Sequence, residues 1–289
     1  MRLLNFLDEY TGRPTLGARV GDAVVDLTAE GLPDTVDALL ALGEAGLERA
    51  RHTLAGPLRR QRALDGITLL PPVLQPSKAF GIGLNYRDHA REIGASAPPH
   101  PVLFQRFASS WVGHGQPLIR SRLSTQFDYE AELVAVIGKA GRHITRDQAL
   151  EHVAGYSIFN DGTVRDYQAR SHQWLWGKNF DASGGFGPEI VTADELPRGA
   201  QGLSVQCRLN GQLLQDGNTR DMIFDVAALV CACSEGIELH PGDLIITGTP
   251  AGVGFVRQPQ VWLRHGDVCE VTIEGIGTLT NPVSDGPLA

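Results

Sequence analysis

Long apolar segments and an excess of basic residues are both missing from this chain of 289 residues. The longest uninterrupted apolar run is about eight residues, Val226 to Cys233, whereas a helix needs roughly 18 or more to span a bilayer. Lys and Arg total 25 against 33 Asp and Glu, which gives a formal net charge of −8. The chain therefore has no general electrostatic footprint for nucleic acid or an anionic membrane, and we expect neither as a partner.

Cysteine is also scarce, and its spacing excludes a cysteine-based metal site. The four residues are Cys207, Cys231, Cys233 and Cys269. Cys231 and Cys233 stand two apart in an apolar stretch with helical pattern, where positions i and i+2 do not face each other. No export signal is visible near Met1, so we expect buried, reduced thiols and a cytoplasmic location.

Several catalytic motifs are absent as well. The chain contains no Gly-x-Ser-x-Gly elbow, no Gly-x4-Gly-Lys-Ser/Thr loop and no His-Glu-x-x-His helix. Gly81-x-Gly83 resembles the start of a dinucleotide fingerprint, but Tyr86 stands where the third glycine would be. Common serine-hydrolase, nucleotide and zinc-protease chemistries are therefore excluded.

Glycine is abundant, with 34 residues or about 12% of the chain against an average near 7%. The pattern predicts many tight turns between short strands, in a mixed α+β fold that is mainly β. Three prolines between Pro71 and Pro76 interrupt regular structure and predict a small N-terminal α+β domain over residues 1–72 and a larger domain over 73–289. The predicted strands are 2–7, 15–20, 24–27, 102–107, 130–137, 154–159, 203–209, 244–247 and 268–273, with a hairpin at Asn210-Gly211. The predicted helices are 35–42, 45–54, 85–93, 146–152, 162–170 and 222–234.

Three acidic residues alternate along one predicted strand. Asp128, Glu130 and Glu132 share one face of it, and both faces become apolar beyond Glu132. Carboxylates at i and i+2 can close on one hard divalent metal ion, for which oxygen ligands are preferred. The alternative is a solvated strand edge with Lys or Arg partners.

Asp161 follows an apolar strand at the point where a helix is expected to begin. It is a plausible helix N-cap, and it is also where a third metal ligand would lie. If Glu130, Glu132 and Asp161 converge, they formally carry three negative charges, which we expect only a metal ion to make tolerable.

Two further segments carry candidate catalytic groups. His89 and Glu92 are three apart on a predicted helix, so Glu92 can orient the imidazole and leave its other nitrogen free to take a proton. Such a pair is also common on ordinary surface helices. Lys178 lies in a glycine-dense loop, and the segment 247–254 offers hydroxyls and free backbone amides around Thr249 that can bind a carboxylate or an enolate oxygen.

Together these segments resemble the fumarylacetoacetate hydrolase family. The resemblance covers about 78–282 and is carried by these motifs: Gly83-Leu-Asn-Tyr-x-x-His89-x-x-Glu92, Pro101-x-x-Phe104, Asp128-x-Glu130-x-Glu132, Gly155-Tyr-x-x-x-Asn160-Asp161, Arg165-Asp-x-Gln168, Gly177-Lys178-x-Phe-Asp181, Pro241-Gly-Asp243 and Thr247-Gly-Thr249-Pro-x-Gly-Val-Gly254.

The family resemblance implies a β-roll-like catalytic domain, often a homodimer, with Mg²⁺ or Mn²⁺ held by three carboxylates. Matched position by position, the metal ligands are Glu130, Glu132 and Asp161. The catalytic residues that the resemblance implies are His89, Glu92 and Lys178, and the implied substrate contacts are Tyr86, Arg106, Gln168 and Thr249. Two departures stand out: Arg106 replaces a frequent Lys, and the loop after Lys178 reads Asn-Phe-Asp-Ala-Ser-Gly-Gly-Phe-Gly-Pro.

The predicted activity is hydrolysis of a C–C bond in an acylpyruvate, such as fumarylpyruvate or maleylpyruvate, during breakdown of aromatic compounds. His89 would deprotonate the attacking water, and the metal with Lys178 would stabilise a pyruvate enolate. Decarboxylation of an oxaloacetate-like acid, or hydration or isomerisation of an unsaturated oxo acid, uses the same parts and stays open. A metal-binding protein without catalytic activity is a third alternative. In each enzymatic case the substrate is a small anionic 2-oxo acid.

Overall fold

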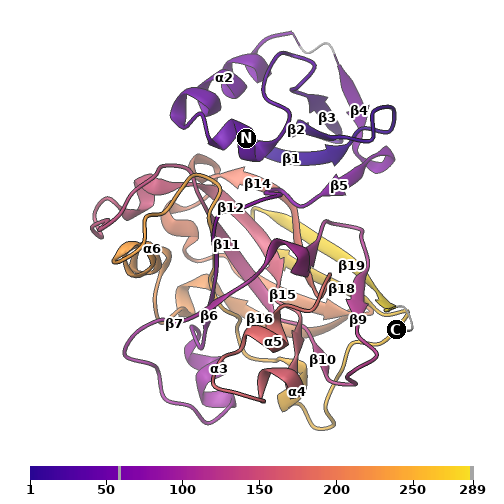
Figure 1. Cartoon of the computed structure of the whole chain (residues 1–289), viewed down its shortest axis with the longest axis vertical. Helices are drawn as coiled ribbons and strands as arrows, with labels where there is room; N and C mark the ends of the chain where they lie inside the picture. Colours follow the sequence, from indigo (N-terminus) through magenta and orange to yellow (C-terminus); the bar gives the residue numbers. More distant parts are fainter. Residues whose placement is uncertain (58–59, 287–289) are drawn as a thin grey trace.

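The computed structural model describes residues 1–57 and 60–286, and these form a mainly β protein (Figure 1). The central element is a 12-stranded sheet with the order β4-β3-β2-β1-β14-β12-β11-β17-β6-β7, to which β5 and β8 are added at β1 and β14. Its strands are β1 (Arg2–Leu7), β2 (Pro14–Val20), β3 (Ala23–Asp26), β4 (Gln61–Ala63), β5 (Thr68–Leu70), β6 (Ala79–Gly83), β7 (Val102–Gln105), β8 (Trp111–Val112), β11 (Ala131–Ile137), β12 (Val153–Asn160), β14 (Gly184–Thr192) and β17 (Leu244–Ile246).

A second sheet packs against the first. It has five strands in the order β16-β15-β18-β19-β9, and β10 pairs with β13 in a separate two-stranded ladder. The bounds are β9 (Leu118–Arg120), β10 (Phe127–Asp128), β13 (Thr163–Val164), β15 (Ser204–Leu209), β16 (Gln212–Asn218), β18 (Val268–Ile273) and β19 (Gly277–Asp285). The expected mainly β class and the hairpin at Asn210-Gly211 are confirmed.

The helices are short and lie outside the sheets. They are α1 (Val36–Leu40), α2 (Glu44–Ala55), α3 (Arg87–Glu92), α4 (Arg165–Gln168), α5 (Leu175–Lys178) and α6 (Val226–Ser234). Figure 1 shows α1 and α2 with the N-terminal strands at one end of the molecule and α3, α4 and α5 together at the other. None of the helices in 1–57 and 60–286 is long and apolar enough to cross a membrane.

The predicted boundary at residue 72 lies between β5 and β6, yet the sheet crosses it. β1 pairs antiparallel with β14 through Arg2↔Val191 and Leu3↔Ile190, so the N-terminal strands extend the sheet of the larger part. The two parts therefore share a hydrophobic core, in which Leu3 and Ile190 are both buried.

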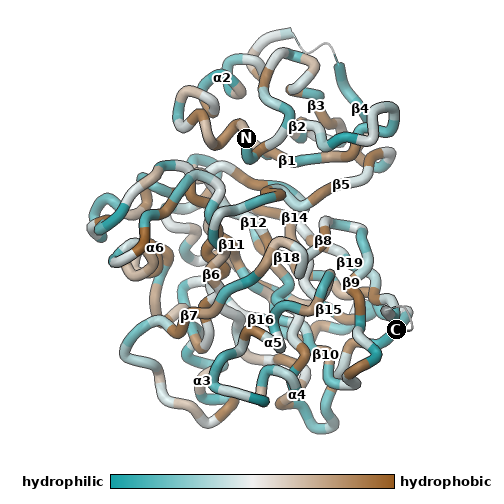
Figure 2. The backbone as a smooth tube through the Cα atoms, viewed as in Figure 1, coloured by the Kyte–Doolittle hydropathy of each residue, from teal (hydrophilic) through white to brown (hydrophobic). Residues whose placement is uncertain are grey.

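The middle of the large sheet is buried on both faces because β11 and β12 are covered on each side. Leu133 and Ala135 of β11 pack with residues of β15 and β18, whereas Val134 and Val136 pack with the core that includes the N-terminal helices. Figure 2 shows hydrophobic stretches running through this interior, while many outer loops are hydrophilic. The prediction that both faces are buried beyond Glu132 is confirmed.

Two predicted helices are corrected by the structure. Residues 162–170 begin as β13, which pairs with β10, and only Arg165–Gln168 is helical. The cap of α4 is Val164, so Asp161 is not a helix N-cap. Of the predicted helix 146–152, only a 3-10 segment at Ala149–His152 forms. The predictions also lack β14, whose sequence GGFGPEIVT is rich in turn-forming residues.

Candidate metal centre and active-site cavity

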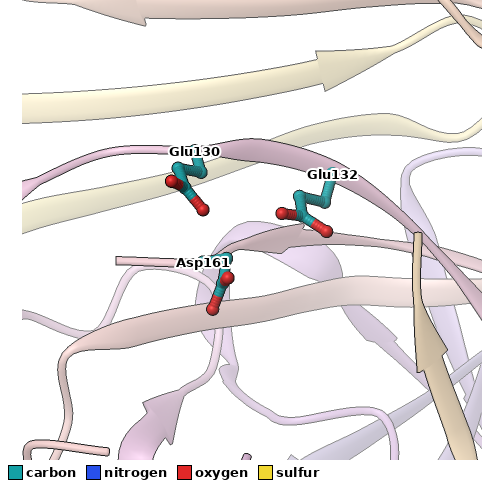
Figure 3. A group of neighbouring side chains, drawn as sticks. All are labelled: Glu130, Glu132 and Asp161. Atoms are coloured by element: carbon teal, nitrogen blue, oxygen red, sulfur yellow. The ribbon is translucent and has the colours of Figure 1, made fainter. Parts of the chain in front are cut away.

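The three carboxylates predicted as metal ligands converge because of the register between β11 and β12. Ala131 is paired with Asn160, so the residues just beyond this pair, Glu130 and Asp161, lie opposite each other, and the Asp161 N–H donates to the Glu130 carbonyl at 2.9 Å. Glu132 is two residues from Glu130 and shares its face. One ligand oxygen from each of the three lies within 4.8 Å of the others, and Figure 3 shows the carboxylates facing a common space.

This site is buried and is not a solvated strand edge, although the Lys and Arg partners of that alternative are present. Glu130 is 5% exposed, Glu132 1% and Asp161 0%. Buried carboxylates that close together require a cation, and an all-oxygen donor set suits a hard divalent ion. The cluster therefore fits a divalent metal ion.

Cationic side chains already contact two of the three carboxylates. Lys178 Nζ lies 2.6 Å from Glu130 Oε2 and 2.5 Å from Asp161 Oδ2. Arg165 Nη2 lies 2.6 Å from Glu130 Oε1, and Arg106 Nη1 lies 2.9 Å from Asp161 Oδ1. Burial opposes ionisation of Glu130, but the charges of Arg165 and Lys178 outweigh it and lower the pKa of Glu130 to about 2.

Glu132 is the carboxylate without an ion pair to a described residue. Its Oε2 accepts a hydrogen bond from the Gly248 amide at 2.5 Å. Burial, with the nearby charges of Asp161 and Glu130, raises the pKa of Glu132 well above its usual range. An added cation would therefore act most strongly on Glu132.

Asp128 does not belong to this cluster, although it alternates with the two glutamates in sequence. The chain leaves β10 at Asp128 and enters β11 only at Ala131, so the strand is interrupted. Asp128 accepts hydrogen bonds from the Gly254 and Phe255 amides and from Arg165 Nε at 2.7, 3.1 and 2.8 Å. It therefore positions Arg165 and the loop around Gly254.

The predicted His–Glu pair forms on α3. His89 Nδ1 lies 3.2 Å from Glu92 Oε2, and the Gly252 amide donates to both Glu92 oxygens at 2.9 and 3.1 Å. His89 is 6% exposed and lines the same cavity as Glu130 and Glu132. With Nδ1 directed at Glu92, its Nε2 is left without a hydrogen bond to the described part of the chain and is available for proton transfer.

A cavity of about 1070 Å³ is lined by His89 and by two of the three carboxylates, Glu130 and Glu132, whereas Asp161 and Glu92 are not among its lining residues. Six of the predicted site residues line it: His89, Glu130, Glu132, Gln168, Lys178 and Thr249. Gln168 Oε1 accepts from Arg165 Nη1 at 3.0 Å, and Thr249 Oγ1 accepts from Gln215 Nε2 at 2.7 Å. These contacts hold two polar side chains at the wall.

The other two predicted substrate contacts, Arg106 and Tyr86, do not line this cavity. Arg106 lies behind Asp161, where Nη1 also donates to the Gly162 carbonyl and Nη2 to the Ser110 carbonyl, at 3.1 and 3.0 Å. Tyr86 is fully buried, and burial raises the pKa of its hydroxyl well above its usual range. Arg106 is positioned to hold a metal ligand, and its contact with substrate stays a prediction, as does that of Tyr86.

The two departures noted in the sequence are adjacent in space. A Cβ on Gly184 would overlap Arg106 Nη2, so the glycine leaves room for the guanidinium group. A lysine in place of Arg106 would end in a compact ammonium group without a second Nη atom, so it would not need the space beside Gly184.

Arg165, Phe104 and Trp174 also line the cavity, and they are not among the residues that the sequence predicts for the site. Arg165 contacts Glu130 and Gln168 and lies 4.3 Å from the centre of the Phe255 ring. Arg165 and Gln168 are three residues apart on one helical turn and therefore lie on the same face, and this spacing could have indicated Arg165 as a site residue. Phe104 stands in the Pro101-x-x-Phe104 motif of the family resemblance, whereas no local signal distinguishes Trp174, which tertiary packing places there.

Comparison with known proteins gives a consistent result. The family model described as fumarylacetoacetate (FAA) hydrolase C-terminal matches residues 78–284. The chain is 39% identical over 291 residues to an oxaloacetate tautomerase of Xenopus laevis, named as mitochondrial, covering 98% of this chain and 90% of that protein.

Two solved structures have the same fold over nearly the whole chain. A fumarylacetoacetate hydrolase from Exiguobacterium antarcticum is 36% identical with a TM-score of 0.84, covering 99% of this chain and 100% of that one. Maleylpyruvate hydrolase from Sphingobium sp. SYK-6, solved with manganese(II) and pyruvate, is 28% identical with a TM-score of 0.82 and the same coverage.

Proposed function

Because the chain belongs to the fumarylacetoacetate hydrolase family, we propose that it is a divalent-metal enzyme that interconverts the keto and enol forms of oxaloacetate. The observation that carries the proposal is His89, which is held by Glu92 and lines one cavity with Glu130 and Glu132. The 39% identity to an oxaloacetate tautomerase over 98% of the chain supports this reaction.

Glu130, Glu132 and Asp161 would hold Mg²⁺ or Mn²⁺, since these ions take oxygen ligands. When bound, such an ion supplies Lewis-acid polarisation of the substrate carbonyl and carboxylate oxygens. The manganese(II) in the related maleylpyruvate hydrolase is consistent with this assignment.

The proton transfer is assigned to His89. Its Nε2 takes a proton from C3 of oxaloacetate, the C3–H electron pair forms the C2–C3 double bond, and the C2 oxygen receives a proton. Glu92 holds the imidazole through Nδ1 and stabilises its protonated form. The Lys178 ammonium, 2.6 Å from Glu130 Oε2, lies where it can stabilise the negative charge that develops on the C2 oxygen. Gln168 and Thr249 orient the anionic substrate.

Acylpyruvate hydrolysis remains a second candidate, favoured by the size of the cavity and by the similarity to maleylpyruvate hydrolase. Here His89 Nε2 would take a proton from water, and the water oxygen would attack the C4 carbonyl. The C3–C4 bond would then break to release the carboxylic acid formed at C4 and the enolate of pyruvate, and C3 of the enolate would take the proton from His89 to give pyruvate. A role in aromatic breakdown, decarboxylation of oxaloacetate, a homodimer and a cytoplasmic location stay predictions.

The test is a substrate panel with purified protein. Oxaloacetate ketonisation is followed by loss of enol absorbance, and acetylpyruvate and fumarylpyruvate cleavage by release of pyruvate, each with Mg²⁺, Mn²⁺ or excess chelator. We expect metal-dependent oxaloacetate turnover, and a loss of about 10²–10⁴-fold in His89→Ala. Cleavage of acylpyruvates without oxaloacetate turnover would favour the second candidate. Full activity in chelator would refute both.

A further inference from the structure

The cavity continues beyond the carboxylates along an aromatic wall. Phe104 at the end of β7 and Trp174 just before α5 lie side by side, with ring centres 5.8 Å apart. Lys178 Nζ lies 4.9 Å from the centre of the Phe104 ring. The wall therefore begins directly beside the ammonium group that contacts Glu130 and Asp161.

Two glycines on β6 make this wall possible. Gly81 is paired with Phe104 in the sheet, and a Cβ there would overlap the phenyl ring. A Cβ on Gly83 would overlap the Trp174 indole in the same way. The Gly81-x-Gly83 motif, which lacks the third glycine of a dinucleotide fingerprint, leaves space for two aromatic rings to pack against the strand.

The rest of this part of the cavity is mixed, because the polar side chains of Gln105, Ser171, His172 and Gln173 line it beside apolar ones. The apolar side chains come from β6, β7 and nearby loops: Leu84, Ile93, Val102, Leu103, Leu175 and Ile237. At about 1070 Å³ the cavity reaches the upper end of the roughly 300–1,000 Å³ usual for pockets that enclose drug-sized ligands. A four-carbon dianion at the carboxylates leaves this part unfilled.

Charge also argues against a second acidic group in this part. The lysines and arginines that line the cavity within the described residues are Lys78, Arg165 and Lys178, and each is engaged by a carboxylate: Lys78 Nζ lies 2.8 Å from Asp243 Oδ2. Burying a carboxylate without a free cationic partner is unfavourable. This part is suited to a neutral substituent.

We propose that the site also accepts 2-oxo acids with a planar, apolar group on C3, with the ring of that group lying along Trp174 and Phe104. Phenylpyruvate represents this class. The inference rests on the proposed function, because the reaction is the same: the C3–H bond breaks, His89 takes the proton, and an O–H bond forms at the C2 oxygen, with no oxidant or co-reactant. Trp174 then determines specificity between aryl and small acidic substrates.

The experiment compares keto–enol conversion of phenylpyruvate and oxaloacetate by the wild-type protein, Trp174→Ala and Trp176→Ala, in the presence of Mn²⁺. Trp176 is a matched control, because it lies two residues away, is 68% exposed and does not line the cavity. One missing methylene contact in a hydrophobic substrate pocket already costs about 10–200-fold in kcat/KM. We expect a loss in this range for Trp174→Ala on phenylpyruvate, a change below about twofold on oxaloacetate, and no effect of Trp176→Ala.

The outcomes separate the two proposals. Oxaloacetate turnover without phenylpyruvate turnover, or an equal loss on both substrates in Trp174→Ala, would overturn the aryl proposal alone. If neither substrate reacts, the proposed function fails, and the aryl proposal is then tested by calorimetric binding of phenylpyruvate to the Mn²⁺-loaded proteins. Tighter binding by wild type than by Trp174→Ala would support an aryl-binding pocket, and equal binding would overturn it. Gly83→Ala, which displaces the indole, is expected to reproduce the Trp174→Ala pattern.

Discussion

Arg106 and Gly184 are expected to be energetically coupled, and a double-mutant cycle can measure this. The Arg106 side chain is 0% exposed and donates to Asp161, Gly162 and Ser110. Gly184, at the start of β14, leaves the space that Nη2 occupies. Gly184→Ala should therefore force the guanidinium group away from its partners.

The magnitude follows from the contacts. Adding a methyl group to a tightly packed site costs typically about 1–3 kcal/mol. In Arg106→Lys the donor to the Ser110 carbonyl is lost, and a buried acceptor left without a partner costs about 1–3 kcal/mol. The methyl group of Gly184→Ala then meets no guanidinium, although the Asn160 carbonyl and the Phe159 ring still lie 3.1 and 3.2 Å from it. We expect the two substitutions together to cost about 1–2 kcal/mol less than the sum of the single changes, within the usual range of about 0.5–3 kcal/mol for contacting residues.

The assay is equilibrium urea unfolding of wild type, both single variants and the double variant, with the free energy of unfolding taken at a common slope. Gly185→Ala is the matched control. Its Cβ would overlap the Asn281 side-chain oxygen instead of Arg106, so its cost should add to that of Arg106→Lys. If Gly184→Ala and Arg106→Lys also add to within about 0.5 kcal/mol, the coupling is refuted.

Three further predictions concern the metal centre and the helix α3. Glu130→Gln should weaken Mn²⁺ binding, measured by calorimetry, by more than the roughly 10–100-fold typical of residues outside the ligand shell, and Asp128→Asn should stay within that range. Lys178→Met should lower kcat by about 10²–10³-fold, because the ammonium group that stabilises the developing negative charge is lost. It should not weaken Mn²⁺ binding, because the Lys178 ammonium contacts Glu130 and Asp161, two of the carboxylates that would hold the metal. A loss of Mn²⁺ affinity would contradict this. Glu92→Gln should lower kcat less than the about 10²–10⁴-fold expected for His89→Ala, since the base itself remains; equal losses would show that Glu92 acts in some other way.

The metal centre was predictable from sequence only in part. The alternation of Glu130 and Glu132 places both on one face by the geometry of a strand alone. Asp161 joins them through the register of β11 and β12, which pairs Ala131 with Asn160 and cannot be obtained from periodicity. Asp128 was grouped with them because alternation assumes an unbroken strand, and the break after Asp128 invalidates that assumption.

The fold shows the same limit. Strands with β-branched and apolar alternation, such as β1 and β18, were predicted with their observed bounds. β14 was missed because glycine and proline at Gly184–Pro188 are typical of turns. Within the protein these glycines are required by neighbours from distant segments, since a Cβ on Gly184 would overlap Arg106 and one on Gly185 would overlap Asn281. Contacts of this kind, between residues far apart in sequence, leave no local signal.

The arrangement of charges explains how an acidic protein can hold an anionic substrate. Around the metal centre, and apart from the His89–Glu92 pair, four described carboxylates (Asp128, Glu130, Glu132 and Asp161) lie with three cationic side chains (Arg106, Arg165 and Lys178). Glu132 is thus left without a cationic partner, and burial with its acidic neighbours raises its pKa well above its usual range. With Glu132 ionised, a divalent cation at this position changes the formal charge of this group of side chains from −1 to +1. Affinity for a 2-oxo acid should therefore depend on the metal even though Lys178 and Arg165 are present without it, because both are already neutralised by carboxylates.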